Sequence, residues 1–308
     1  MNLVQGNVAI RVENLEKRYG ATVAVDRISF EVREGEVFGI VGPNGAGKTT
    51  TVECLAGLRQ PDGGSVSVLD LDPQKAGRKL RERVGVQLQQ AALPDDLRVW
   101  EALDLYASFY KNASDRRPLL EQWGLEEKAY TRFKDLSGGQ KQRLFIALSL
   151  VNDPDLVFLD EITTGLDPQA RRATWDLIRA IRERGTTVVL VTHYMDEAEK
   201  LCDRVAIIDG GQIVALDSPE ALVRGIRAET NVRFGGLNGF DPAPLRDLPG
   251  VSRVVREADD VVVYGHGPLL ARSVVELDHH GITPTEVSVG RPTLEDVFIE
   301  KTGRKIRD

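Results

Sequence analysis

The chain has 308 residues, enough for one large domain or for two domains of unequal size. Hydrophobic residues make up 42% and charged residues 28%, the composition of an ordinary soluble globular protein. Its 40 basic residues are outnumbered by 47 acidic ones, which gives a net charge of -7. Because nucleic acids attract basic surfaces, we expect no nucleic-acid partner.

The cysteines and the apolar runs exclude further classes. Cys54 and Cys202 belong to no Cys-x-x-Cys or Cys/His cluster, so we expect neither a zinc site nor a disulfide. The first residues lack the basic-then-apolar order of a signal peptide, and no run reaches the roughly 18 apolar residues of a membrane-spanning helix. We therefore expect a cytoplasmic protein. Any membrane that it serves must be spanned by another polypeptide.

Strand and helix patterns alternate over the first 220 residues, which predicts an α/β fold with a mainly parallel sheet. Helical spacing predicts a helix from Thr49 to Leu58, a mostly helical subdomain from about 95 to 150, and a helix over Pro168–Arg184 with Asp167 as its N-cap. Alternation or short apolar runs predict strands over 8–19, 22–32, Val37–Val41, 64–70, 84–88, Leu156–Asp160, Thr187–Thr192, 204–209 and 212–217.

The pattern changes near residue 228, so we predict a domain over 1–227 and a smaller α+β domain over 228–308. The second domain shows strand, helix or loop, two strands across a turn at Ala258–Asp260, helix and strand, which is the ferredoxin-like order. A last helix is predicted over Pro292–Lys301, with Thr293 and Asp296 near its start.

The segment Gly42–Thr49 (GPNGAGKT) fits the phosphate-loop pattern G-x-x-x-x-G-K-S/T between a buried strand and a helix. Its glycines let backbone N–H groups face phosphate oxygens, and the helix N-terminus adds positive potential. Lys48 is expected to reach the β- and γ-phosphates, and the Thr49 hydroxyl to ligate Mg²⁺. The pattern alone fits kinases, GTPases, helicases and transport ATPases equally well.

Two carboxylates, Asp160 and Glu161, end the buried strand Leu156–Asp160. Ligands bind beyond the carboxyl ends of parallel strands, so Asp160 can hold Mg²⁺ and Glu161 can polarise an attacking water. An exposed acidic turn is the alternative reading of this pair. The phosphate loop favours the functional reading.

A second anion site is predicted at Leu136–Gln140 (LSGGQ), where a serine and two glycines precede a helix. Together with GPNGAGKT, LVFLDE, GLDP and VTH, in this order and spacing, the segment resembles the nucleotide-binding subunits of ABC transporters over residues 8–217. The resemblance implies a phosphate-loop core, an antiparallel β subdomain and a helical signature subdomain. It also implies two subunits, a second copy or a homologous ATPase, packed head to tail.

The resemblance assigns roles on both sides of the nucleotide. Tyr19 resembles the aromatic that stacks on adenine, with Val25 as a supporting apolar contact. Without the resemblance, Tyr19 would be interpreted as a core or strand-edge aromatic. Asp167 resembles a residue that touches the partner's site. The remaining implied ATP contacts in the same chain are Gly42, Pro43, Asn44, Gly45, Ala46, Gly47, Lys48, Thr49 and Thr50, and those offered to the partner's ATP are Ser137, Gly138, Gly139 and Gln140.

Two further residues complete the implied catalytic set of Glu161, His193, Gln89 and Lys48. Gln89 resembles the glutamine that contacts Mg²⁺ and the attacking water, with Gln87 and Gln90 as neighbouring alternatives. His193 resembles the switch histidine at the γ-phosphate, although a lone histidine at a strand end can also be structural. Ile162 stands where the family usually has proline, from which we expect a small change in backbone stiffness.

The segment Gly290–Phe298 (GRPTLEDVF) resembles the tail of ABC ATPases of the daunorubicin-resistance type, which serve drug and antibiotic exporters. It also reads as a capped helix with Leu294, Val297 and Phe298 facing inward. The resemblance implies export of drugs, antibiotics or other small lipophilic compounds. The subunit would lie on the inner face of the cell membrane, bound to an integral membrane permease.

Three other classes share parts of this pattern. Chromosome-maintenance and DNA-repair ATPases carry a long coiled coil between the two nucleotide motifs, whereas only Thr50–Leu136 intervene here and show no heptads. Translation-type factors carry two cassettes in one chain, and only one is present. A non-hydrolysing ATP sensor is disfavoured because Glu161 and His193 are both in place.

Overall fold

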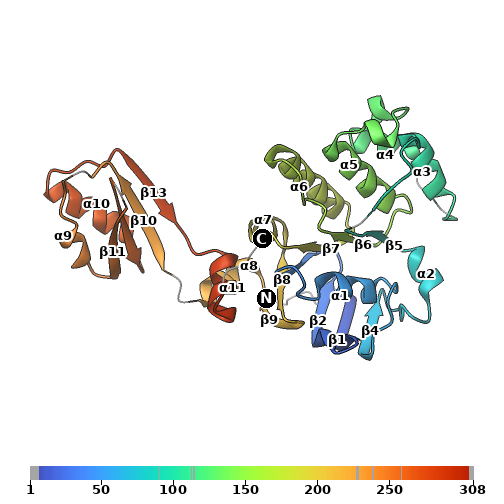
Figure 1. Ribbon diagram of the computed structural model, residues 1–308, viewed down its shortest axis with the longest axis horizontal. Helices are drawn as coiled ribbons and strands as arrows, with labels where there is room; N and C mark the ends of the chain where they lie inside the picture. The colour runs from blue at the N-terminus through green and yellow to red at the C-terminus, as the bar shows by residue number, and fades with distance from the viewer. Residues whose placement is uncertain are drawn as a thin grey trace. The chain divides into compact units, whose positions relative to one another are not determined.

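The computed structural model describes residues 7–89, 91–111, 113, 115–226, 229–237, 239–257 and 259–304. They form two compact units (Figure 1). The first comprises the described residues up to Glu220 together with Arg304, and the second comprises Ala221–Gly303. The predicted domain boundary, between residues 227 and 228, falls outside the described residues and stays a prediction.

A six-stranded sheet forms the centre of the first unit, in the order β5-β6-β7-β3-β8-β9. All neighbouring strands are parallel except β8 and β9, which are antiparallel and form a hairpin. The strands are β3 (Val37–Val41), β5 (Val84–Gln87), β6 (Leu156–Asp160), β7 (Thr187–Thr192), β8 (Arg204–Asp209) and β9 (Gln212–Asp217). Strands β3, β6 and β7 are buried at every position, so the prediction of a mainly parallel α/β core is confirmed.

A second, antiparallel sheet has the order β2-β1-β4 and contains β1 (Val8–Tyr19), β2 (Thr22–Arg33) and β4 (Gly63–Val68). It shares a hydrophobic core with the central sheet, in which the rings of Phe30 and Phe38 stack 5.3 Å apart. This packing fixes the end of β1, where Tyr19 lies, relative to the phosphate loop after β3.

The helices of the first unit are α1 (Lys48–Leu55), α2 (Gly77–Arg81), α3 (Val99–Ala107), α4 (Arg116–Gln122), α5 (Gly138–Ser149), α6 (Pro168–Glu183) and α7 (Met195–Leu201), with 3-10 turns η1 (Glu126–Lys128) and η2 (Phe133–Asp135). Helix α8 (Pro219–Gly225) begins in the first unit and ends in the second. Figure 1 shows α3, α4 and α5 grouped together in green, as the predicted helical subdomain requires. The first helix ends at Leu55 and not at Leu58, because Gly57 adopts a left-handed backbone conformation.

The second unit contains β10 (Thr230–Gly235), α9 (Ala243–Arg246), β11 (Val251–Glu257), β12 (Asp260–Gly265), α10 (Leu269–His279), β13 (Glu286–Gly290) and α11 (Leu294–Thr302). Its sheet has the order β11-β12-β10-β13 and is antiparallel throughout. This is the predicted ferredoxin-like arrangement. Residue 258, in the predicted turn, lies outside the described residues.

Helix α11 begins with the expected capping box, in which Asp296 accepts from the Thr293 backbone N–H. The three residues predicted to face inward, Leu294, Val297 and Phe298, are buried. Cys54 and Cys202 are buried free thiols. None of the described helices is long and apolar enough to cross a membrane.

Candidate functional site

The loop between β3 and α1 requires glycine at two positions. A Cβ atom at Gly42 would lie 2.1 Å from the carbonyl oxygen of Ile208, and one at Gly47 would lie 2.1 Å from that of Ala24. Gly47 also has a φ of 101°, in the left-handed region, where it serves as the N-cap of α1. The loop can therefore wrap tightly only with glycine at both positions.

The loop presents positive groups to the space that it encloses. Among the described residues, no oxygen accepts from the backbone N–H groups of Gly45, Gly47 or Lys48. The Lys48 side chain is only 4% exposed, and its Nζ donates to the carbonyl oxygens of Gly42 and Pro43 at 2.9 and 3.0 Å. Burial lowers the pKa of Lys48, against the opposing effect of Glu161. These free donors at a helix N-terminus fit a phosphate chain.

The other loop positions predicted to contact ATP flank these donors, and Ala46 accepts from Gly211 N–H through its carbonyl. Within the loop, Asn44 is exposed, Pro43 is half-buried and Ala46 is buried, while Thr49 and Thr50 lie in the first turn of α1.

Glu161 is the centre of the predicted catalytic set. Its Oε1 lies 3.4 Å from Lys48 Nζ and 3.4 Å from His193 Nδ1. Its Oε2 accepts from Gln89 Nε2 at 2.8 Å. Because β5, β6 and β7 are parallel neighbours, the segments that follow them meet at one edge of the sheet and bring Gln89, Glu161 and His193 together.

The sequence offered three glutamines as the one that contacts Mg²⁺ and the attacking water, and the structure distinguishes among them. Gln89 reaches Glu161, whereas Gln87 belongs to β5 and is buried. Gln90 lies outside the described residues. The geometry thus supports Gln89 as the glutamine of the site.

Asp160 is a buried carboxylate beside the phosphate loop. It is 1% exposed, and neither side-chain oxygen has a hydrogen-bond partner among the described residues. Burial raises its pKa to about 6, while the nearby Thr49 hydroxyl, short of full hydrogen-bond geometry, acts in the opposite direction. A carboxylate, a hydroxyl and the amide of Gln89 are oxygen donors of the kind that Mg²⁺ prefers, so these residues fit the expected ion.

The adenine end of the predicted site contains Tyr19, whose ring is 42% exposed at the end of β1. Two cations cover this ring: Arg59 Cζ lies 5.2 Å and Lys17 Nζ 5.8 Å from its centroid. Val25 is buried and lies opposite Lys17 in the β1–β2 ladder. Neither cation was predicted from the sequence, although Lys17 lies two residues before Tyr19, the spacing that places two side chains on one face of a strand.

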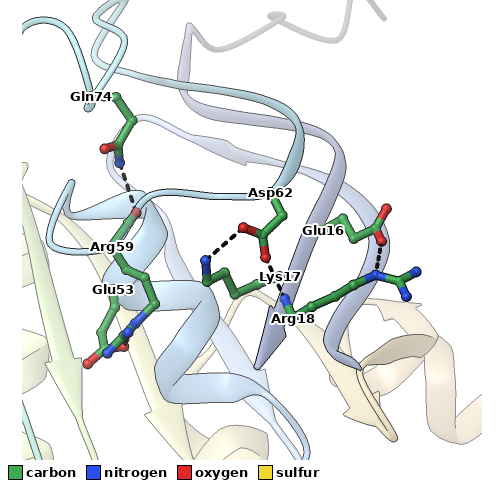
Figure 2. Close-up of polar contacts among 7 residues, drawn as sticks. All are labelled: Glu16, Lys17, Arg18, Glu53, Arg59, Asp62 and Gln74. Carbon is green, nitrogen blue, oxygen red and sulfur yellow. Dashed lines mark hydrogen bonds and ion pairs between the residues drawn. The ribbon is translucent and has the colours of Figure 1, made fainter. Parts of the chain in front are cut away.

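An ion-pair network fixes these two cations (Figure 2). Arg59 Nε lies 2.5 Å from Glu53, and Lys17 Nζ lies 2.9 Å from Asp62, which also accepts from the Arg18 backbone N–H at 2.7 Å. Figure 2 shows these carboxylates beside the basic side chains that they hold. Both pairs are partly buried, and they hold the two cations beside the Tyr19 ring.

The signature segment caps its own helix. Ser137 accepts from Gln140 N–H and Gln140 Oε1 accepts from Ser137 N–H, while Gly138 and Gly139 form the first turn of α5. None of the hydrogen bonds of Ser137 or Gln140 in the described part of the chain reaches the phosphate loop. The structure thus does not join the two motifs within one chain, and action on a partner's ATP stays a prediction.

Asp167 caps α6, as predicted: its Oδ1 accepts from the N–H groups of Gln169 and Ala170 at 2.9 Å each. Its expected contact with a partner's site stays a prediction.

Comparison with known proteins identifies the family. The model of the family described as ABC transporter matches residues 25–164. The Nod factor export ATP-binding protein I of Burkholderia orbicola is 40% identical over 97% of this chain and 98% of its own length. The chain belongs to the ABC transporter family. Within this family it is an ATP-binding subunit, an ATPase coupled to transport.

Solved ABC structures agree with the fold of the first unit. The ATP-binding subunit of an ABC transporter is 28% identical, with a TM-score of 0.64 over 70% of this chain and 92% of that one. A dimeric ATP-binding cassette in a post-hydrolysis state, bound to ADP and Pi, is also 28% identical, with a TM-score of 0.60 over 68% of this chain and 98% of that one.

Proposed function

We propose that this ABC ATPase powers an exporter of small lipophilic compounds, such as drugs or antibiotics, through an integral membrane permease. Relatives that align over 97% of the chain are named for Nod factor export, which supports export over import. The segment Gly290–Phe298, which resembles the tail of drug-exporter ATPases, supports the same class of cargo. The chain would then lie on the inner face of the membrane, with residues 228–308 as an accessory domain.

The convergence of Lys48, Gln89 and His193 on Glu161 is the observation that carries the proposed chemistry. The Lys48 ammonium lies 3.4 Å from the Glu161 carboxylate. The γ-phosphate offers Lys48 a stronger anionic partner, which frees Glu161 to accept a proton from the attacking water. Gln89 and His193 then orient the water and the phosphate.

Thr49, Gln89 and Asp160 are the residues that would hold Mg²⁺. When bound, the ion neutralises charge on the phosphate oxygens. Asp160 contributes to its binding only as the carboxylate, so Mg²⁺ binding should weaken as the pH falls below about 6, the pKa to which burial raises this group.

The partner of this chain is a second copy or a homologous ATPase. Ser137, Gly138, Gly139 and Gln140 cap α5 at a helix N-terminus, which is suited to cover the γ-phosphate held by another subunit. ATP contacted by both subunits closes the head-to-tail dimer, and hydrolysis removes this link. The permease converts the closing into transport.

The test is the purified complex with its permease, reconstituted in lipid, in wild-type and Glu161→Gln forms. We expect the variant to bind ATP within a few-fold of wild type, to accumulate as an ATP-bound dimer, and to hydrolyse at least about 100-fold more slowly. Glu183→Gln, at the exposed end of α6, is the matched control and should behave as wild type. Wild-type turnover by Glu161→Gln would refute the mechanism. Stable binding to DNA or ribosomes without any membrane partner would refute the transport function.

A further inference from the structure

Two polar contacts fasten α7 to α6 immediately after His193. Arg171 Nη2 lies 3.1 Å from Asp196 Oδ2, and Trp175 Nε1 donates to Glu197 Oε1 at 2.8 Å. The Glu197 carboxylate is 1% exposed, so this donor offsets part of the cost of its burial. Helix α7 begins two residues after His193, and the position of its first turn limits where that histidine can lie.

Tyr194 connects this helix pair to the histidine ring. The ring centroids of His193 and Tyr194 are 4.0 Å apart, with an angle of 44° between the planes. Arg171 Cζ lies 5.1 Å from the centroid of the Tyr194 ring, so one guanidinium contacts both Tyr194 and Asp196. The chain of contacts therefore runs from α6 through Tyr194 to His193.

The orientation of His193 needs such a support. In proteins, the direction of a histidine ring is commonly set by a hydrogen bond at one of its nitrogens. Here Nδ1 has no hydrogen-bond partner among the described residues, although it lies 3.4 Å from Glu161. Packing against Tyr194 is the contact that can hold the ring toward Glu161.

The same guanidinium belongs to the first turn of α6, next to a residue at the predicted dimer interface. Arg171 N–H donates to the Asp167 carbonyl at 2.9 Å, and the Asp167 side chain caps the helix. A shift of Asp167 would move this turn and Arg171 with it, because a capped helical turn moves as one rigid piece.

We propose that Arg171 and Tyr194 are positioning residues, which hold the imidazole of His193 toward Glu161 and make its position depend on Asp167. This inference rests on the proposed role of His193. It adds a connection between the dimer interface and the hydrolysis site of the same subunit. ATP turns over at full rate only when the first turn of α6 lies where Arg171 and Tyr194 hold His193 toward Glu161.

The experiment measures steady-state ATPase activity of the reconstituted complex with Tyr194→Leu and Tyr194→Phe. Leucine removes the ring, and we expect kcat to fall about 10-fold or more while KM changes less than about 2-fold. Phenylalanine keeps the ring, and kcat should stay within about 2-fold of wild type. In a His193→Ala background, Tyr194→Leu should cause no further loss, because both changes remove the same support.

Arg171→Met removes the charge but keeps the stem, and should lower kcat several-fold with little change in KM. The matched control is Arg179→Met, which breaks the exposed Arg179–Asp176 pair on the same helix and should leave kcat unchanged. If Tyr194→Leu prevents folding, Arg171→Met carries the test.

Two outcomes separate this inference from the proposed function. If His193→Ala retained the wild-type rate, the role of His193 would be wrong and the inference would fail with it. If His193→Ala were slow while Tyr194→Leu and Arg171→Met turned over at the wild-type rate, the inference alone would be overturned. Additive losses in the double variant would also overturn it, since Tyr194 would then act independently of His193.

Discussion

Asp160→Asn should make the metal-free protein more stable while it removes Mg²⁺-dependent hydrolysis. Asp160 is 1% exposed, and both its oxygens lack hydrogen-bond partners among the described residues. Burial of this carboxylate raises its pKa from 3.8 to about 6. Asparagine is neutral and nearly the same size, so it removes the charge without leaving a cavity.

The pKa shift sets both the size and the sign of the effect. A shift of about two units at roughly 1.4 kcal/mol per unit corresponds to about 3 kcal/mol of destabilisation in wild type. Because the folded-state pKa is raised, the folded protein binds this proton more tightly than the unfolded chain. The penalty is therefore full above about pH 6, falls between pH 6 and 3.8, and vanishes below that range.

Urea denaturation in the presence of a chelator, at pH 8 and pH 5, measures this difference. The three tryptophans of the chain, Trp100, Trp123 and Trp175, all lie in the first unit, so their fluorescence reports its unfolding. The free energy of unfolding of Asp160→Asn should exceed that of wild type by up to about 3 kcal/mol at pH 8 and by about half of that at pH 5. The exposed control Asp176→Asn should change stability by less than about 1 kcal/mol. A gain that is absent or equal at the two pH values would refute the desolvation argument.

Three further substitutions test other parts of the structure. Gly47→Ala should weaken ATP binding more than about 10-fold in an equilibrium binding assay, since its Cβ would lie 2.1 Å from the Ala24 carbonyl oxygen; unchanged affinity would contradict the loop geometry. Trp175→Phe should lower the free energy of unfolding by about 1–3 kcal/mol in urea denaturation, because the buried Glu197 carboxylate loses a hydrogen-bond donor. Burial already raises the pKa of Glu197, so the loss should be larger at pH 8 than at pH 5, and an equal loss at both pH values would exclude this cause. Phe234→Ala should lower the free energy of unfolding of the second unit by about 3–5 kcal/mol, because the ring is fully buried in its core. Limited proteolysis of this unit should then be faster than in wild type, and a wild-type rate would mean that this core is dispensable.

The sequence predicted the fold where local signals and buried runs agree. Val37–Val41 and Leu156–Asp160 are apolar strands of the kind that only a covered parallel sheet can bury, and both are fully buried. Asp167 was expected as an N-cap because its side chain precedes a proline and a helical pattern, and it accepts two backbone N–H groups there. Each of these predictions depends on residues within a few positions of one another.

Features that depend on distant residues could not be predicted in this way. The contact between Gln89 and Glu161 spans 72 positions, and only the strand order brings the two together. Glu161 has a φ of 50°, a left-handed conformation that costs about 1–3 kcal/mol for a residue other than glycine. This conformation of the central residue of the site left no signal in the sequence.

The charges around Glu161 explain why a subunit on its own should bind ATP yet hydrolyse it slowly. Glu161 is surrounded by Lys48, Gln89 and His193, so both of its carboxylate oxygens are already engaged by side chains. ATP can draw Lys48 away, but the γ-phosphate is still covered from one side only, because the capped signature helix of the same chain does not reach the loop. A second subunit contacts the γ-phosphate from the other side. Its contact with Asp167 would at the same time fix the position of α6 and, through it, of His193. Rapid turnover should therefore depend on subunit concentration more steeply than ATP binding does, and a rate per subunit that stayed constant on dilution would contradict this account.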